Sequence, residues 1–178
     1  MERAGRRRTS GPLRFRTEAM NATPSCPGLA GLERTLRRLQ SLPPELVRQA
    51  LVQYSRKLAP LPEHLRTLPR EPFAVHECQT PVALYPEVVD GRLVFWADVP
   101  ASAPSIRALL AVLFEAFNGC PPEEIEGIPS DFVRRLMDRL GLGAREAGLN
   151  AIVERLRRAA RQARQGAGLA PGAGAAPN

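Results

Sequence analysis

The residue that stands out for its chemistry is Cys78, which lies in the segment FAVHECQTPVAL between two extended stretches. A thiol attacks another sulfur as its thiolate and must be reachable by its partner, which a loop position allows. His76 can supply a nearby positive charge or accept the thiol proton, whereas the carboxylate of Glu77 opposes thiolate formation. The sequence therefore predicts a sulfur nucleophile at Cys78. The alternative is a small buried hydrophobic side chain, a common role for an isolated cysteine.

The other two cysteines, Cys26 and Cys120, lie far from Cys78 and from each other in the sequence. An odd number of widely spaced cysteines argues against a disulfide scaffold, so we expect all three thiols to be reduced, as in a cytoplasmic protein. Metal binding is the rival interpretation, since His64 and His76 add two possible ligands. Structural zinc sites use closely paired cysteines or histidines, and neither pairing is present, so we expect no metal site.

The elements that must position Cys78 follow from hydrophobic periodicity and turn residues. Apolar residues recur every three or four positions over residues 29–39 and 46–58, which predicts two opening helices with the Pro43-Pro44 pair between them. Residues 73–99 are rich in β-branched and aromatic side chains, and Asp90-Gly91 divides them, which predicts a β-hairpin. Further helices are expected in the segments SIRALLAVLFEAFNG, which is almost entirely apolar and therefore buried, CPPEEIEG, FVRRLMDRLGLG and AREAGLNAIVERLRRAARQAR.

This order of elements predicts an α+β fold, with a small antiparallel sheet of about three strands packed against several helices. We expect a single domain over residues 29–164. Residues 1–28 and 165–178 lack apolar periodicity and are predicted to be disordered tails, the first basic and the second rich in Ala, Gly and Pro. Residues 1–20 are alternatively a targeting arm of an organellar protein, and Met20 is an alternative start.

The formal charge of +7 over 178 residues is concentrated at the two ends of the chain. Residues 1–20 carry +4 and residues 155–178 carry +5, whereas residues 21–154 between them carry −2. Because the expected core is mildly acidic, we expect no nucleic-acid partner. No window approaches the roughly 18 apolar residues that a membrane span needs, so we expect no membrane partner either.

The order of short motifs resembles the SufE/CsdE family of sulfur-acceptor proteins in iron–sulfur cluster assembly. The resemblance covers about residues 40–160. The matching elements are a Tyr-containing helix ending in Leu-x-x-Leu-Pro (Tyr54 to Pro62), the cysteine element VHECQT, the hairpin from Gly91 to Asp98, an Ile-x-x-Leu helix (Ile106 to Leu109), the turn from Gly119 to Ile125 and an Arg-x-x-Gly-Leu motif (Arg145 to Leu149).

The resemblance implies a SufE-like fold and a protein that accepts sulfane sulfur as a persulfide from a cysteine desulfurase and stimulates that enzyme. Cys78 then corresponds to the persulfide acceptor, and Asp98 and Arg145 match family positions near the reactive loop or the partner contact. His76 and Gln79 are expected to support the thiol and the incoming sulfur. The resemblance implies a cytoplasmic carrier and activator rather than a stand-alone enzyme. It needs no cofactor of its own and passes sulfur to an iron–sulfur scaffold or another acceptor.

The chain also departs from the family pattern. Glu77 replaces the family's glycine before the cysteine, where we expect a backbone cost and a raised thiol pKa. Ala83 stands where the family has tryptophan. Cys120 stands where the family has a helix-capping Thr or Ser, which implies a structural role. These differences leave an alternative open, namely a non-catalytic binding or scaffold module on the same fold that has lost efficient sulfur transfer.

Overall fold

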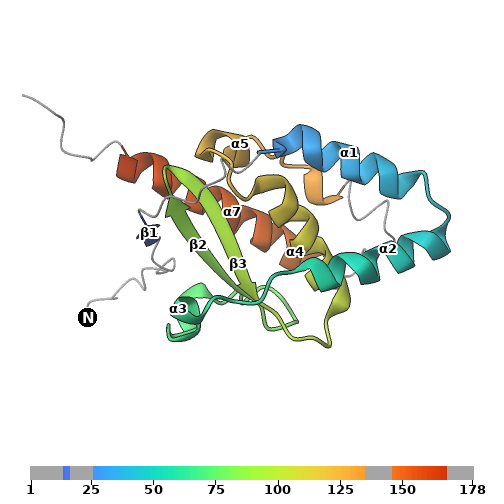
Figure 1. The fold of residues 1–178 in the computed structure, drawn as a ribbon, viewed down its shortest axis with the longest axis horizontal. Coiled ribbons are helices and arrows are strands. Elements are labelled where there is room, and N and C mark those ends of the chain that lie inside the picture. The colour runs from blue at the N-terminus through green and yellow to red at the C-terminus, as the bar shows by residue number, and fades with distance from the viewer. Residues whose placement is uncertain (1–13, 17–25, 135–145, 168–178) are drawn as a thin grey trace, which may run out of the picture.

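The computed structural model describes residues 14–16, 26–134 and 146–167. Helices surround a small sheet, and the long helix α7 runs behind the β-hairpin (Figure 1). The elements are β1 (Arg14–Arg16), α1 (Gly28–Gln40), α2 (Pro44–Lys57), α3 (Glu63–Arg66), the short 3-10 helix η1 (Glu71–Phe73), β2 (Ala83–Val89), β3 (Arg92–Asp98), α4 (Pro104–Phe117), α5 (Pro122–Glu126) and α7 (Glu146–Ala167). The α+β class predicted from the sequence is confirmed.

The hairpin of β2 and β3 forms as the sequence predicts. The two strands pair in antiparallel register from Ala83 opposite Asp98 to Val89 opposite Arg92. Asp90 and Gly91 connect them with φ angles of 50° and 74°. Two successive positive φ angles match the right-handed twist of the strands, and Asp-Gly is a favoured sequence for such a turn.

The third strand differs from the expected antiparallel arrangement. β1 pairs with β2 in parallel, with Arg14 opposite Glu87, so the sheet order is β1-β2-β3. This strand lies within the residues 1–28 that were predicted to be a disordered tail. A three-residue segment carries too little periodicity to be recognised as a strand, because the pairing partner and not the local sequence selects it.

The main core forms around α4, which contacts α1, α2 and β3. Most of its side chains are buried, including Ile106, Leu110 and Phe117, which confirms the prediction of a buried helix. Each such side chain contributes roughly 1.5–3 kcal/mol when it is removed from water. Helix α7 closes the other side of the core and contacts α5 and β2.

The opposite face of the hairpin carries a smaller cluster made of Leu65, Phe73, Ala83 and Tyr85. Glu87 is buried beside it and is only 2% exposed. Its carboxylate accepts a hydrogen bond from Trp96 Nε1 at 2.9 Å and lies 2.9 Å from His64 Nε2. A buried carboxylate needs such partners, and this pair fastens the segment around α3 to the sheet.

The cysteine prediction is wrong for two of the three residues. Cys26 and Cys120 form a disulfide across a sequence separation of 94 residues, so these two thiols are not reduced. Cys120 is fully buried just before α5, and Cys26 lies just before α1. The structural role implied for Cys120 is thus carried by a covalent bond that joins the start of α1 to the start of α5.

For two further predictions, the structure describes only part of the predicted segment. The helix expected in FVRRLMDRLGLG begins near residue 132, and residues 135–145 lie outside the described residues. Residues 168–178, most of the predicted C-terminal tail, lie outside them as well, whereas α7 extends to Ala167. Among the helices that the structure describes, none is both long enough and apolar enough to cross a membrane.

Candidate functional site

The segment that carries Cys78 is a loop whose two ends are fastened together. Ala74 and Ala83 form an isolated antiparallel bridge, and the Val75 N–H donates to the Val82 carbonyl at 2.8 Å. Inside the loop, the Cys78 N–H donates to the Val75 carbonyl at 3.2 Å, which makes a tight turn. Residues 76–81 therefore project as a short loop from the end of the hairpin, here called the Cys78 loop.

The thiol of Cys78 lies outside the disulfide and is half-buried. It rests on the first turns of α7 at Gly148. A Cβ atom placed on Gly148 would lie 2.6 Å from Cys78 Sγ and 3.2 Å from its Cα. Such distances are far below van der Waals contact, so the absence of a side chain at residue 148 is what lets the loop sit against the helix.

Glu77 does not carry the cost that the sequence suggests. Among the described residues other than glycine, only Asp90 has a positive φ angle, so Glu77 occupies an ordinary backbone conformation. Its Oε2 lies 3.6 Å from Nη2 of Arg155 on α7. A hydrogen bond from its own backbone N–H and the charge of Arg155 lower the pKa of the Glu77 carboxyl. Arg155 thus offsets a charge that would otherwise oppose a thiolate at Cys78.

The two predicted neighbours of the thiol are both exposed. His76 Nε2 lies 3.5 Å from Glu71 Oε1, and both side chains are largely in solvent. An exposed pair of this kind contributes little to stability. Gln79 is exposed on the same loop. The roles assigned to His76 and Gln79 in sulfur chemistry stay predictions.

Asp98 lies at the base of the Cys78 loop, opposite Ala83 at the end of β3. Its carboxylate accepts a hydrogen bond from Arg70 Nε at 2.9 Å. The charge of Asp98 also affects Tyr85 in the smaller cluster. The pKa of Tyr85 is raised, mainly by burial and also by the nearby charge of Asp98, whereas the charge of Arg70 lowers it. Arg70 precedes η1, so the Arg70–Asp98 pair ties the segment that leads into the loop to the strand beside it.

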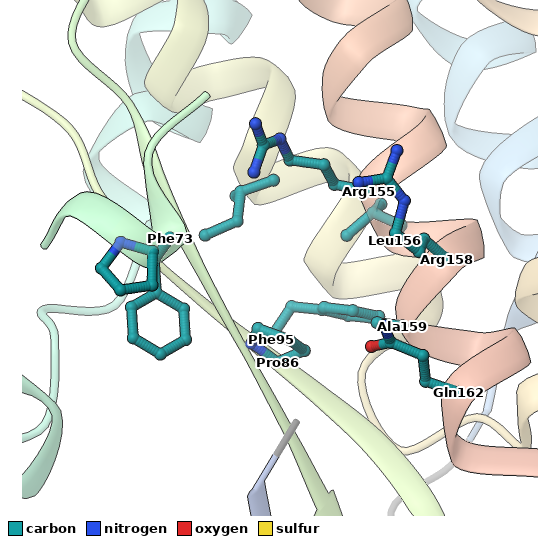
Figure 2. A pocket seen from close by; sticks show the side chains of 10 residues that line it. Phe73, Pro86, Phe95, Arg155, Leu156, Arg158, Ala159 and Gln162 are labelled. Carbon is teal, nitrogen blue, oxygen red and sulfur yellow. The ribbon is translucent and has the colours of Figure 1, made fainter. Parts of the chain in front are cut away.

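A shallow cleft that is open to solvent lies between the hairpin and α7. Figure 2 shows Phe73 and Pro86 on the side of the sheet, and Arg155, Arg158 and Gln162 on the side of α7. The lining is largely apolar, with guanidinium groups on one side. Because Arg155 both lines this cleft and contacts Glu77, the cleft adjoins the Cys78 loop.

Cys78, Cys120, His64 and His76 are the side chains that the sequence offers as metal ligands. In the parts of the chain that the structure describes, no group of three or more His, Cys, Asp or Glu side chains is arranged to hold a metal ion. Cys120 is bonded to Cys26, His64 faces Glu87 and His76 faces Glu71. These candidate ligands are therefore engaged in different parts of the fold.

Comparison with known proteins identifies the family of this chain and a similar solved structure. The SufE family, described as an Fe-S metabolism associated domain, matches residues 33–160, more than two thirds of the chain. The chain belongs to the SufE family. The solution structure of a hypothetical protein from Thermus thermophilus is similar to it, with 32% identity and a TM-score of 0.65, over 76% of this chain and 96% of that one. No curated protein matches the chain. The predicted family is confirmed, and with it a general role in iron–sulfur metabolism.

Arg145 of the SufE motif Arg-x-x-Gly-Leu lies outside the described residues, so its predicted role stays a prediction. The structure instead gives the glycine of that motif, Gly148, a direct contact with Cys78. Sequence reasoning missed both Gly148 and Arg155. A signal for Gly148 was present, because a glycine inside a predicted amphipathic helix indicates a close approach by another part of the chain. No local signal marks Arg155 among the other arginines of α7.

Proposed function

We propose that this SufE-family protein accepts sulfane sulfur from the persulfide of a cysteine desulfurase on Cys78 and stimulates that enzyme. The sulfur then passes to an iron–sulfur scaffold or another acceptor. The observation that carries the proposal is the contrast among the cysteines: Cys26 and Cys120 are joined to each other, whereas Cys78 lies on a loop as a thiol. We expect this transfer to take place in the cytoplasm because the family resemblance implies it; the cysteines do not support that location, since Cys26 and Cys120 are not reduced.

The chemistry is a thiol exchange in which atoms and charges balance. The Cys78 thiolate attacks the terminal sulfur of the donor's Cys–S–SH group, a new S–S bond forms on Cys78, and the S–S bond of the donor breaks. The donor cysteine leaves as a thiolate, and the transferred sulfur keeps its proton. No redox partner is needed, because one S–S bond replaces another.

The structure offers three supports for this chemistry. The loop position lets Cys78 enter a partner's active site. The sulfur of Cys78 lies against Gly148 of α7, where the absence of a side chain leaves room for it. Arg155 offsets the neighbouring carboxylate of Glu77. Asp98, with Arg70, is placed to hold the base of the loop, and we propose for Asp98, His76, Gln79 and Arg145 the supporting roles that the family resemblance implies.

Mass spectrometry tests the proposal directly. The full chain is incubated with a cysteine desulfurase and cysteine, and the peptide that contains Cys78 is expected to gain about 32 Da, the mass of one sulfur atom. The variant Cys78→Ser is expected to gain none and to lose stimulation of the desulfurase. Sulfur on Cys26 or Cys120 instead would overturn the site. Full stimulation by Cys78→Ser would favour the alternative of a binding or scaffold module.

A further inference from the structure

Movement of the Cys78 loop away from α7 widens the path by which a donor sulfur reaches its thiol. Exchange requires the incoming disulfide or persulfide to approach Sγ along the axis of the bond that breaks. Cys78 is half-buried and rests on Gly148, so part of the space around Sγ is occupied by α7. The interactions that hold the loop on α7 therefore control how often the thiol is accessible.

The contact between Glu77 and Arg155 is such an interaction. It joins the residue before Cys78 to a position two turns further along α7 than Gly148. Arg155 is only 21% exposed at its side chain, so its stem is packed and its guanidinium is held in place. The pKa of the Glu77 carboxyl is lowered first by a hydrogen bond from its own backbone N–H and then by the charge of Arg155, so both favour the carboxylate that pairs with Arg155.

We propose that the Glu77–Arg155 ion pair is a positioning device that holds Cys78 against α7 and sets the rate at which its thiol becomes accessible. Glu77 and Arg155 act through the loop and do not touch the sulfur donor. The biological use of this ion pair rests on the proposed function. Its effect on the thiol does not, since the accessibility of a thiol can be measured without any sulfur donor. It also gives Glu77 a use that glycine at the same position does not have.

The experiment follows alkylation of Cys78 by iodoacetamide in the full chain without reductant. Because Cys26 and Cys120 are joined, Cys78 is the thiol that reacts. The alkylation rate is measured as a function of pH for the unmodified chain and for each variant. The plateau rate, reached when the thiol is fully ionised, is then compared between them. A change in the thiol pKa moves the curve along the pH axis, whereas a change in accessibility raises the plateau.

Glu77→Gln and Arg155→Gln are each expected to raise the plateau rate about two- to fivefold, the size of an exposed ion-pair effect on an equilibrium. Their shifts of the thiol pKa have opposite signs, because one removes a negative and the other a positive charge. The double variant is expected to be no faster than the faster single variant, since both remove the same contact. The exchange Glu77→Arg with Arg155→Glu is expected to restore the plateau.

Glu123→Gln is the matched control. Glu123 of α5 lies 3.5 Å from Arg164, also on α7, and the pair is remote from the Cys78 loop in the sequence. Its plateau rate is expected to equal that of the unmodified chain. A plateau for Glu77→Gln equal to that of Glu123→Gln, or an exchange variant as fast as the single variants, would overturn the inference. Failure of Cys78 to accept sulfur while this pattern holds would overturn the proposed function alone.

Discussion

The two regions of the molecule that contain cysteine use the same side chain in opposite ways. Around α1 and α5, Cys26 and Cys120 are joined covalently, and Cys120 is fully buried. Around β2 and α7, Cys78 lies outside the disulfide, and the contacts that hold it include two backbone hydrogen bonds in and at the base of its loop, its packing against Gly148 and the ion pair of its neighbour Glu77. One region is fixed, and the other is fastened weakly.

The difference between the two regions indicates which part of the domain can move. A crosslink over 94 residues keeps the segment before α1 on the helical core whatever happens elsewhere. The contacts of the Cys78 loop are individually small, so they can be broken and remade at little cost, as a residue that must meet a partner requires. A stable framework and an easily opened loop are thus built into separate parts of one domain.

Removing the disulfide is expected to have the largest effect on stability. Closing a loop of about 95 residues restricts the unfolded chain by about 4–5 kcal/mol in the chain-entropy estimate. The double variant Cys26→Ala with Cys120→Ala should therefore unfold at a much lower urea concentration, measured by circular dichroism. Cys78→Ser is the control and should stay within about 1 kcal/mol of the unmodified chain. Equal midpoints for all three proteins would contradict the division into a fixed and a weakly fastened region.

Replacing glycine by alanine at two positions compares the regions directly. At Gly148 a Cβ would meet Cys78 Sγ at 2.6 Å, whereas at Gly127, after α5, it would meet the Glu123 and Glu124 carbonyls at 3.4 Å. We expect Gly148→Ala to lose about 1–3 kcal/mol through overpacking and to raise the alkylation rate of Cys78. Gly127→Ala should be nearly neutral and leave that rate unchanged. A Gly148→Ala protein with an unaltered Cys78 rate would show that the loop does not rest on the helix.

The sequence was sufficient to predict the parts of the fold that local patterns decide. The Asp90-Gly91 turn and the β-branched and aromatic residues on both sides of it specify the hairpin, and the apolar run of residues 105–117 specifies a buried helix. The position of Cys78 between two extended stretches likewise predicted the loop. These features depend on residues within a few positions of each other, so their physical causes can be read locally.

What could not be predicted depends on segments far apart in the chain. The partner of Cys26 lies 94 residues away, and an odd cysteine count argued against any pairing. Gly148 and Arg155 lie about 70 to 80 residues from the loop that they contact. Nothing near Glu77 indicated that an arginine would offset its charge, so the sequence suggested a penalty where the structure shows a partner. Tertiary contacts decide these points, and local spacing is silent on them.

The smallest expected effect is the pH dependence of the Cys78 loop. The pKa of Glu77 is lowered in the folded protein, so the folded state favours the ionised carboxylate more than the unfolded state does. Its contribution to stability is fully present above the unfolded value near 4.5 and is lost as the pH falls through the folded value. Because the Glu77 side chain is 49% exposed, solvent limits this contribution to less than about 1 kcal/mol.

The difference in unfolding free energy between the unmodified chain and Glu77→Gln isolates that contribution. It is expected to be constant from pH 7 down to about pH 5 and to shrink toward zero as the carboxyl is protonated at lower pH. Urea titrations at several pH values measure it, with Glu123→Gln as the comparison from the fixed region. A difference that grows on acidification would mean that the carboxylate of Glu77 destabilises the folded loop. The ion pair with Arg155 would then not be what holds Cys78 on α7.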